Sequence, residues 1–197
     1  MIIKPNMEHI FDDKDAMYAL KHDVEIGIRL QGIWQCDQYR KGQLISGGYP
    51  EPPNIFTTLG RARILNVMFF TLGKTAAIGY YVGIFKTDVT PAAADTAAKL
   101  GSGNAYGACQ ATTDFDETVY EPYTVVTTTT AACTNVASKA EYTMAAGFTV
   151  YGAFLTTDST TTSVSGLLMS AKAFTASRAV IADDVLSITY AISLTSS

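Results

Sequence analysis

The stretch Val185-Leu186-Ser187-Ile188-Thr189-Tyr190-Ala191-Ile192-Ser193-Leu194 alternates large apolar residues with small or hydroxylated ones. Successive side chains of a β-strand point to opposite faces, so the large residues here share one face and the small ones share the other. This pattern predicts a strand that covers a core with its apolar face.

Several segments before this strand carry shorter patterns of the same kind. Apolar runs bounded by Gly, Thr and Asp predict strands at 24–30, 79–85, 123–128, 140–144, 148–155 and 166–174. Many short strands with few helices between them predict a mainly β fold. We therefore expect an antiparallel β-sandwich or barrel, jelly-roll-like, with one or two short helices.

The strongest helix pattern runs from Thr58, the expected cap, to Leu72, with Gly73 as its C-terminal glycine. The expected apolar face of this helix consists of Ala62, Leu65, Phe69 and Leu72. Weaker patterns predict short helices at 12–21 and 91–100.

The composition changes near residue 50. Half of the charged residues and both histidines precede about residue 63, and the segment 46–53 is rich in Gly and Pro. We therefore predict a polar, partner-binding N-terminal arm with a short helix and a strand over residues 1–50. A β-sandwich domain with one helix at its start follows over residues 51–197.

The bulk composition bounds the class of partner. Charged residues make up 16% of the chain, against about 25% in soluble domains generally, and the net charge is −4. Because binding to phosphates needs a concentrated basic face, we expect no nucleic-acid partner. No apolar run approaches the roughly 18 residues of a membrane span, and the N-terminus lacks a secretion signal. The prediction is a soluble protein made in the cytoplasm, with Cys36, Cys109 and Cys133 as buried or isolated thiols.

The polar residues offer little for catalysis. General acid–base or nucleophilic chemistry needs a positioned His, Cys or carboxylate, and both histidines, His9 and His22, lie in the predicted arm. The acidic residues are interpreted as helix caps, turn residues and solvated loops, although one acidic group could ligate Ca²⁺. These acidic residues are Asp12, Asp13, Asp183 and Asp184, and the possible Ca²⁺ group is Asp114, Asp116 and Glu117. We expect no enzyme activity, no cofactor and no metal.

A series of short segments follows in a particular order along the chain. They are Pro53-Asn54-Ile55, Gly60, Ile64-Leu65-Asn66, Phe69, Tyr80-Tyr81-Val82-Gly83-Ile84, Ala94-Asp95-Thr96, Gly152-Ala153-Phe154-Leu155, Gly166-Leu167-Leu168-Met169-Ser170-Ala171, Phe174, Arg178-Ala179-Val180 and Asp184-Val185-Leu186-Ser187-Ile188-Thr189-Tyr190. Taken in order, the series resembles a group of small virion proteins of tailed bacteriophages, from about Arg40 to the C-terminus. The resemblance implies an assembled β-sandwich with no cofactor and no catalytic residues.

The leading hypothesis is a capsid decoration (cement) protein on the outer surface of the virion, made in the bacterial host cytoplasm. Its expected partners are the major capsid protein and itself, as a homotrimer or homodimer, with no nucleic acid and no membrane. The residues expected to contact partners are Ile2, Ile3, Ile10, Phe11, Met17, Leu20, Trp34, Tyr39 and Arg40. A head or tail fibre component or adaptor is the alternative. A third hypothesis is a wall- or polysaccharide-degrading enzyme that uses Asp114/Glu117 or Asp183/Asp184.

Overall fold

The computed structural model describes residues 28–69, 79–125 and 130–196. Their strands are β1 (Ile28–Arg40), β2 (Gln43–Ser46), β3 (Ile55–Phe56), β4 (Tyr81–Phe85), β5 (Glu121–Pro122), β6 (Ala132–Thr134), β7 (Ala140–Thr143), β8 (Phe148–Thr156), β9 (Leu168–Val180) and β10 (Val185–Ser196). Their helices are α2 (Thr58–Phe69) and a short 3₁₀ turn, η2 (Ala97–Lys99). No described helix is long and apolar enough to cross a membrane.

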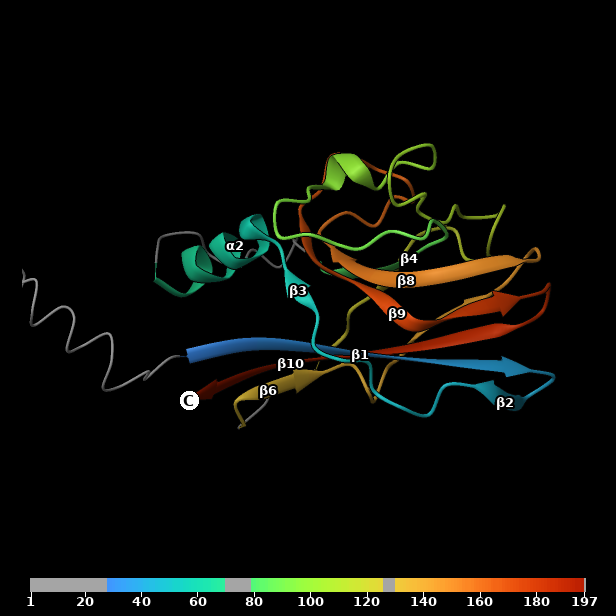
Figure 1. Cartoon of the computed structure of the whole chain (residues 1–197), viewed down its shortest axis with the longest axis horizontal. Helices are drawn as coiled ribbons and strands as arrows, with labels where there is room; N and C mark the ends of the chain where they lie inside the picture. The colour runs from blue at the N-terminus through green and yellow to red at the C-terminus, as the bar shows by residue number, and fades with distance from the viewer. Residues whose placement is uncertain (1–27, 70–78, 126–129, 197) are drawn as a thin grey trace, which may run out of the picture.

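Two antiparallel sheets pack face to face (Figure 1). Sheet A has the order β2-β1-β10-β6, with β7 also paired to β10, and sheet B has the order β3-β9-β8-β4-β5. The predicted mainly β, antiparallel sandwich is confirmed. Helix α2 lies at the same end of the sandwich as the start of β1 and the end of β10 (Figure 1).

Strand β10 has the alternation that its sequence predicts. Leu186, Ile188 and Tyr190 are completely buried between the sheets. Further along the same face, Ile192 is only half-buried and Leu194 is 37% exposed. The inward face of β10 therefore extends beyond the part of the core that the opposite sheet covers.

Strand β1 belongs to the sandwich rather than to a separate arm. It pairs with β10 in continuous register from Ile28 opposite Ser196 to Tyr39 opposite Val185. Trp34 is fully buried and stacks on Tyr190, with 3.9 Å between ring centroids. The predicted division at residue 50 is therefore wrong for residues 28–46, because β1 and β2 are strands of sheet A. The predicted helix at 12–21 and the first half of the predicted strand at 24–30 lie outside the described residues.

Helix α2 forms where the sequence predicts a helix, but its cap and its buried face differ from the prediction. The capping hydroxyl is that of Thr57, which accepts a hydrogen bond from the Gly60 amide at 2.9 Å and donates one to the Leu168 carbonyl of β9. A Cβ on Gly60 would lie 2.2 Å from the carbonyl oxygen of Met169, so this glycine lets the helix approach β9 closely. The approach through Gly60 fixes which side of the helix faces the core.

The side of α2 that the sequence assigns to the core is partly on the outside. Ala62 and Leu65 are exposed, whereas Ile64 is half-buried against the core. The side chains of Phe69 and Leu72, and all of Gly73, lie outside the described residues. The predicted apolar face is thus wrong for Ala62 and Leu65, because the Gly60 contact turns Ile64 inward instead.

Two other predicted elements differ from the observed ones. The segment 91–100 forms a turn followed by η2 rather than one helix, because the Asp95 carboxylate accepts bonds from the Ala92 amide and the Tyr106 hydroxyl. The predicted strand at 123–128 is not observed within 123–125, where the Tyr123 side chain turns inward and its hydroxyl donates to the Tyr190 carbonyl at 3.1 Å. Residues 126–129 lie outside the described part of the chain.

Candidate functional site

An apolar groove opens between the two sheets at the α2 end of the sandwich. It has a volume of about 570 Å³. Sheet A, sheet B, α2 and the segments that flank β4, β5 and β6 all contribute to its walls. The lining residues are Leu30, Phe56, Ile64, Gly79, Tyr80, Tyr123, Val125, Thr130, Ala131, Ala132, Cys133, Leu155, Met169, Ile192, Ser193 and Leu194.

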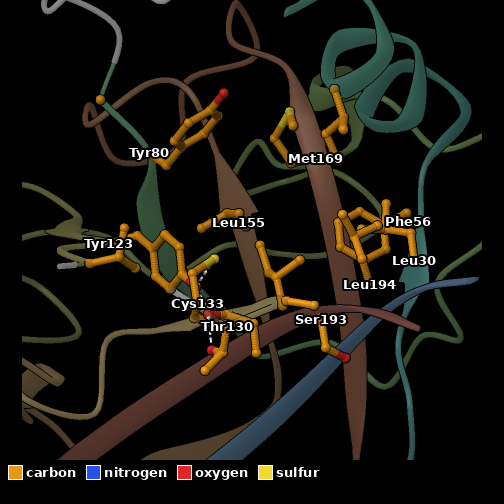
Figure 2. A pocket seen from close by; sticks show the side chains of 16 residues that line it. Leu30, Phe56, Tyr80, Tyr123, Thr130, Cys133, Leu155, Met169, Ser193 and Leu194 are labelled. Atoms are coloured by element: carbon orange, nitrogen blue, oxygen red, sulfur yellow. Dashed lines mark hydrogen bonds between the residues drawn. The ribbon is translucent and has the colours of Figure 1, made fainter. Parts of the chain in front are cut away.

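The groove follows from the unequal lengths of the two apolar faces. Leu194 of β10 lies past the covered part of the core, and Leu30 of β1 is its cross-strand partner in sheet A. Leu155 and Met169 of sheet B lie on the opposite wall (Figure 2). The result is a volume lined by apolar side chains from both layers, which suits apolar groups as ligands.

The chemistry of the groove is limited by its side chains. None of the lining residues is a carboxylate, a lysine, an arginine or a histidine. Burial, followed by the electrostatic effect of the nearby Cys133 side chain, raises the pKa of the Tyr123 phenol above its usual value of 10. The phenol therefore stays protonated at neutral pH, where its hydroxyl is held by the Tyr190 carbonyl. This arrangement can bind an apolar group, and the Tyr123 phenol does not act as a base at neutral pH.

A second apolar feature lies outside the groove, on β3 and α2. Ile55, Leu59 and Leu65 are exposed by 43%, 43% and 55%. We call these three residues the outer helix surface. Large apolar residues exposed outside the core, here on two consecutive elements, are of the kind that contact another protein.

The buried charges of the sandwich are engaged in internal pairs. Asp184, completely buried, accepts hydrogen bonds from Arg40 at 2.7 and 2.8 Å and from Gln38 at 2.9 Å. These bonds, of which that from Arg40 contributes most, lower the pKa of Asp184 to about 2. Asp114 is paired in the same way with Lys86, at 2.7 and 2.8 Å. Both carboxylates therefore have structural roles in the described fold.

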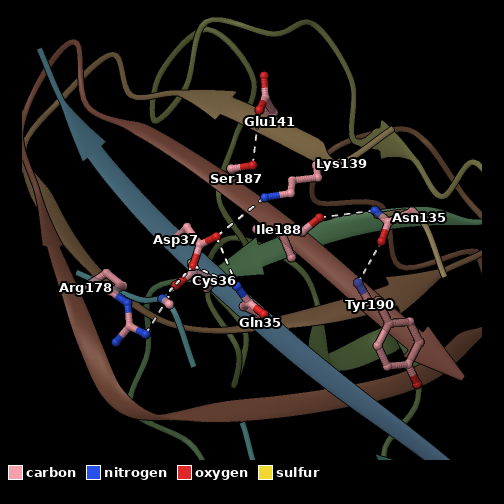
Figure 3. Close-up of polar contacts among 11 residues, drawn as sticks. Gln35, Cys36, Asp37, Asn135, Lys139, Glu141, Arg178, Ser187, Ile188 and Tyr190 are labelled. Carbon is pink, nitrogen blue, oxygen red and sulfur yellow. Dashed lines mark hydrogen bonds and ion pairs between the residues drawn. The ribbon is translucent and has the colours of Figure 1, made fainter. Parts of the chain in front are cut away.

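A smaller pocket of about 460 Å³ lies between the loop after β2 and β9. Its buried charges are Glu51 and Arg178, which are 3.7 Å apart, and Glu51 also accepts bonds from the amide and hydroxyl of Thr175. Arg178 lies beside Cys36, whose neighbour Asp37 is held by Gln35 and Lys139 (Figure 3). The positive charge of Arg178 is therefore neutralised within this pocket by the carboxylate of Glu51.

The thiols of this chain are poor nucleophiles where they are buried. Burial raises the pKa of the Cys36 thiol to about 12, and burial also raises that of Cys109. Both are free thiols, as the sequence predicts, and Cys133 is free and half-buried. No group of three His, Cys, Asp or Glu residues suited to a metal ion occurs in the described ranges.

The structure places the predicted partner-binding residues in different environments. Trp34 is removed from that set, because it is fully buried in the core. Arg40 is 38% exposed and pairs with the buried Asp184, and Tyr39 is half-buried. The other predicted contact residues are outside the described residues: Ile2, Ile3, Ile10, Phe11, Met17 and Leu20.

Sequence reasoning missed the groove and the outer helix surface. For the outer helix surface the sequence does contain a signal, because the helical spacing keeps Leu59 and Leu65 off the face that carries Ile64. Only the contact at Gly60 decides which of these faces is buried.

Comparison with protein families, with curated proteins and with solved structures found no match to this chain.

Proposed function

We propose that this chain is a structural protein of a tailed-phage virion, a capsid decoration protein that binds the outer surface of the major capsid lattice as an oligomer. The observation that carries the proposal is the outer helix surface, Ile55, Leu59 and Leu65, on a body with few charges. The order of short segments that resembles small virion proteins supports the same role. A groove without carboxylates or histidines favours binding over catalysis.

The size of the outer helix surface indicates how such a protein binds. Burying a whole Leu or Ile side chain contributes about 1.5–3 kcal/mol, and roughly half of each side chain is still exposed. The three residues together therefore offer about 3 kcal/mol, less than the about 4 kcal/mol of a millimolar complex. A contact this weak becomes effective when an oligomer presents several copies to a repeating lattice. The bound clamp then stabilises the assembled shell by mass action.

The test is the rupture temperature of purified shells with and without this protein. We expect shells that carry it to rupture at a higher temperature, and the double variant Leu59→Ser/Leu65→Ser to be lost from shells during sedimentation. Val164→Ser is the matched control, because Val164 is exposed by 49% and belongs to the loop between β8 and β9 rather than to α2 or β3. Equal rupture temperatures with and without the protein would sink the proposal.

The fibre alternative predicts a different copy number. A decoration protein is present in hundreds of copies per particle, whereas a fibre or adaptor is present in a few dozen at most. Densitometry of purified particles against the major capsid protein separates the two roles.

A further inference from the structure

The apolar groove needs a cover that the described residues do not supply. Leu194 and Val125 on its walls are 37% and 36% exposed, and no charged residue lines it. Apolar surface of this kind is unfavourable in contact with water. A cavity of about 150 Å³ holds one benzene ring, so a volume of about 570 Å³ has room for three or four apolar side chains.

We propose that the groove is the docking site of the chain's own N-terminal segment, residues 1–27, with Ile10 and Phe11 seated in it. The first reason is where the described chain begins. It starts at Ile28, two residues before Leu30, which is part of the groove wall. The segment is therefore attached at the mouth of the groove.

The length of the segment permits this docking. About 16 residues separate Phe11 from Ile28, which span up to roughly 50 Å when extended, so the side chains can return to the groove. A tethered segment of this length has an effective concentration in the millimolar range. Its own tether thus favours it over the same segment of another copy at micromolar protein concentration.

The composition of the segment matches the groove and a cation next to a groove residue in the sequence. Ile10 and Phe11 are adjacent large apolar residues, and Asp12 and Asp13 follow them directly. In the described fold Arg63, the helix neighbour of the groove residue Ile64, has a buried Nε without a hydrogen-bond partner. An acidic pair next to the apolar pair can supply the partner that this guanidinium lacks. Apolar contacts and charge complementarity therefore point to the same occupant.

Cys133 provides a direct test, because it lines the groove (Figure 2) and is half-buried, whereas Cys36 and Cys109 are buried elsewhere. The experiment uses the full chain with Phe11→Cys under mild oxidation. We expect an intramolecular disulfide to Cys133, identified by peptide mass mapping of monomer separated without reductant. Asp15→Cys in the same segment is the matched control, and we expect it to form the bond at least about tenfold more slowly.

A second measurement follows Cys133 itself in the otherwise native chain. We expect Phe11→Asp to raise the rate of maleimide labelling of Cys133 by at least about tenfold, because a charged side chain cannot occupy the groove. Three results would overturn the proposal: equal bond formation by Phe11→Cys and Asp15→Cys, disulfide-linked dimers in place of intramolecular bonds, or a labelling rate unaffected by Phe11→Asp. Disulfide-linked dimers would assign the groove to a second copy of the chain. An unchanged labelling rate of Cys133 would assign it to a separate apolar ligand. None of these outcomes depends on the virion role.

Discussion

Replacing Asp184 with Asn tests whether the buried carboxylate between the two long strands of sheet A stabilises the fold through its charge. The Asp184 carboxylate accepts hydrogen bonds from the Arg40 guanidinium at 2.7 Å, the Gln38 side-chain amide at 2.9 Å and the Ile181 backbone amide at 3.0 Å. The substitution keeps the shape of the side chain and removes only its charge and one of its acceptor atoms. The new side-chain NH₂ group of Asn would also face groups that donate hydrogen bonds to the Asp184 carboxylate, so it would find no acceptor there.

The magnitude follows from the pKa of the carboxylate. The fold lowers the pKa of Asp184 from 3.8 to about 2, which corresponds to about 2 kcal/mol of stabilisation of the charged form. Because the pKa is lowered on folding, this contribution is complete above the unfolded value of 3.8. It is lost as the pH falls from about 5 to about 2. About 2 kcal/mol is an upper bound, since Arg40 is 38% exposed and water screens the pair.

The assay is thermal and urea unfolding of the native chain, Asp184→Asn and Asp183→Asn at pH 7, 4 and 2.5. Asp183 is the matched control, because it is exposed and has a positive φ of 68°, a conformation that Asn also tolerates. At pH 7 we expect Asp184→Asn to unfold about 4–8 °C below the native chain and Asp183→Asn to unfold with it. The gap should narrow as the pH approaches 2. A gap that stays constant across this pH range refutes the electrostatic reasoning.

Three further predictions concern the core and the thiols. In urea unfolding, Trp34→Ala is expected to destabilise the fold by about 3–5 kcal/mol and Trp34→Phe by less, because the indole is fully buried and stacks on Tyr190. Equal, small effects of the two substitutions would place the indole outside the core. Thr57→Val is expected to lower the free energy of unfolding by about 1–2 kcal/mol in the same measurement, because it removes the hydroxyl that caps α2. Thr58→Val should lower it by less than half as much, and the reverse order would assign the cap to Thr58. Cys36 and Cys109 are expected to react with a maleimide only after unfolding, and labelling of either in native buffer, read by peptide mass, would contradict their burial.

The sequence predicts best where neighbouring residues alone decide the structure. Strands β4, β7, β8 and β10 lie where short apolar patterns place them, because alternation and turn residues are local signals. Strand β1 shows the opposite case. Gln38 sits on its inward face and appears as a polar surface residue in the sequence, but its amide donates to Asp184, which is 146 residues away along the chain. A partner so distant leaves no local trace, so residues 28–40 look like part of a polar arm.

The candidate site is harder to predict for the same reason. The groove depends on how far the inward face of β10 extends past the opposite sheet, and no single segment encodes that difference. The orientation of α2 depends on contact between Gly60 and the Met169 carbonyl, two elements that are remote in the sequence. The low share of charged residues, by contrast, can be read directly from the composition, because composition sums over the whole chain.

The pairing of β1 with β10 has a consequence for how the protein folds during its synthesis. When β1 leaves the ribosome, β10, its long partner in sheet A, has not been translated, and contacts such as that between Gln38 and Asp184 join residues 146 positions apart. Strands β8 and β9, in contrast, emerge in succession and can pair at once. We therefore expect sheet B to form early on the nascent chain and sheet A to form only after β10 is released. Until then, we expect the apolar side chains of β1, Trp34 among them, to be exposed on the nascent chain. This exposure would make β1 a binding site for chaperones and the segment most prone to aggregation during synthesis.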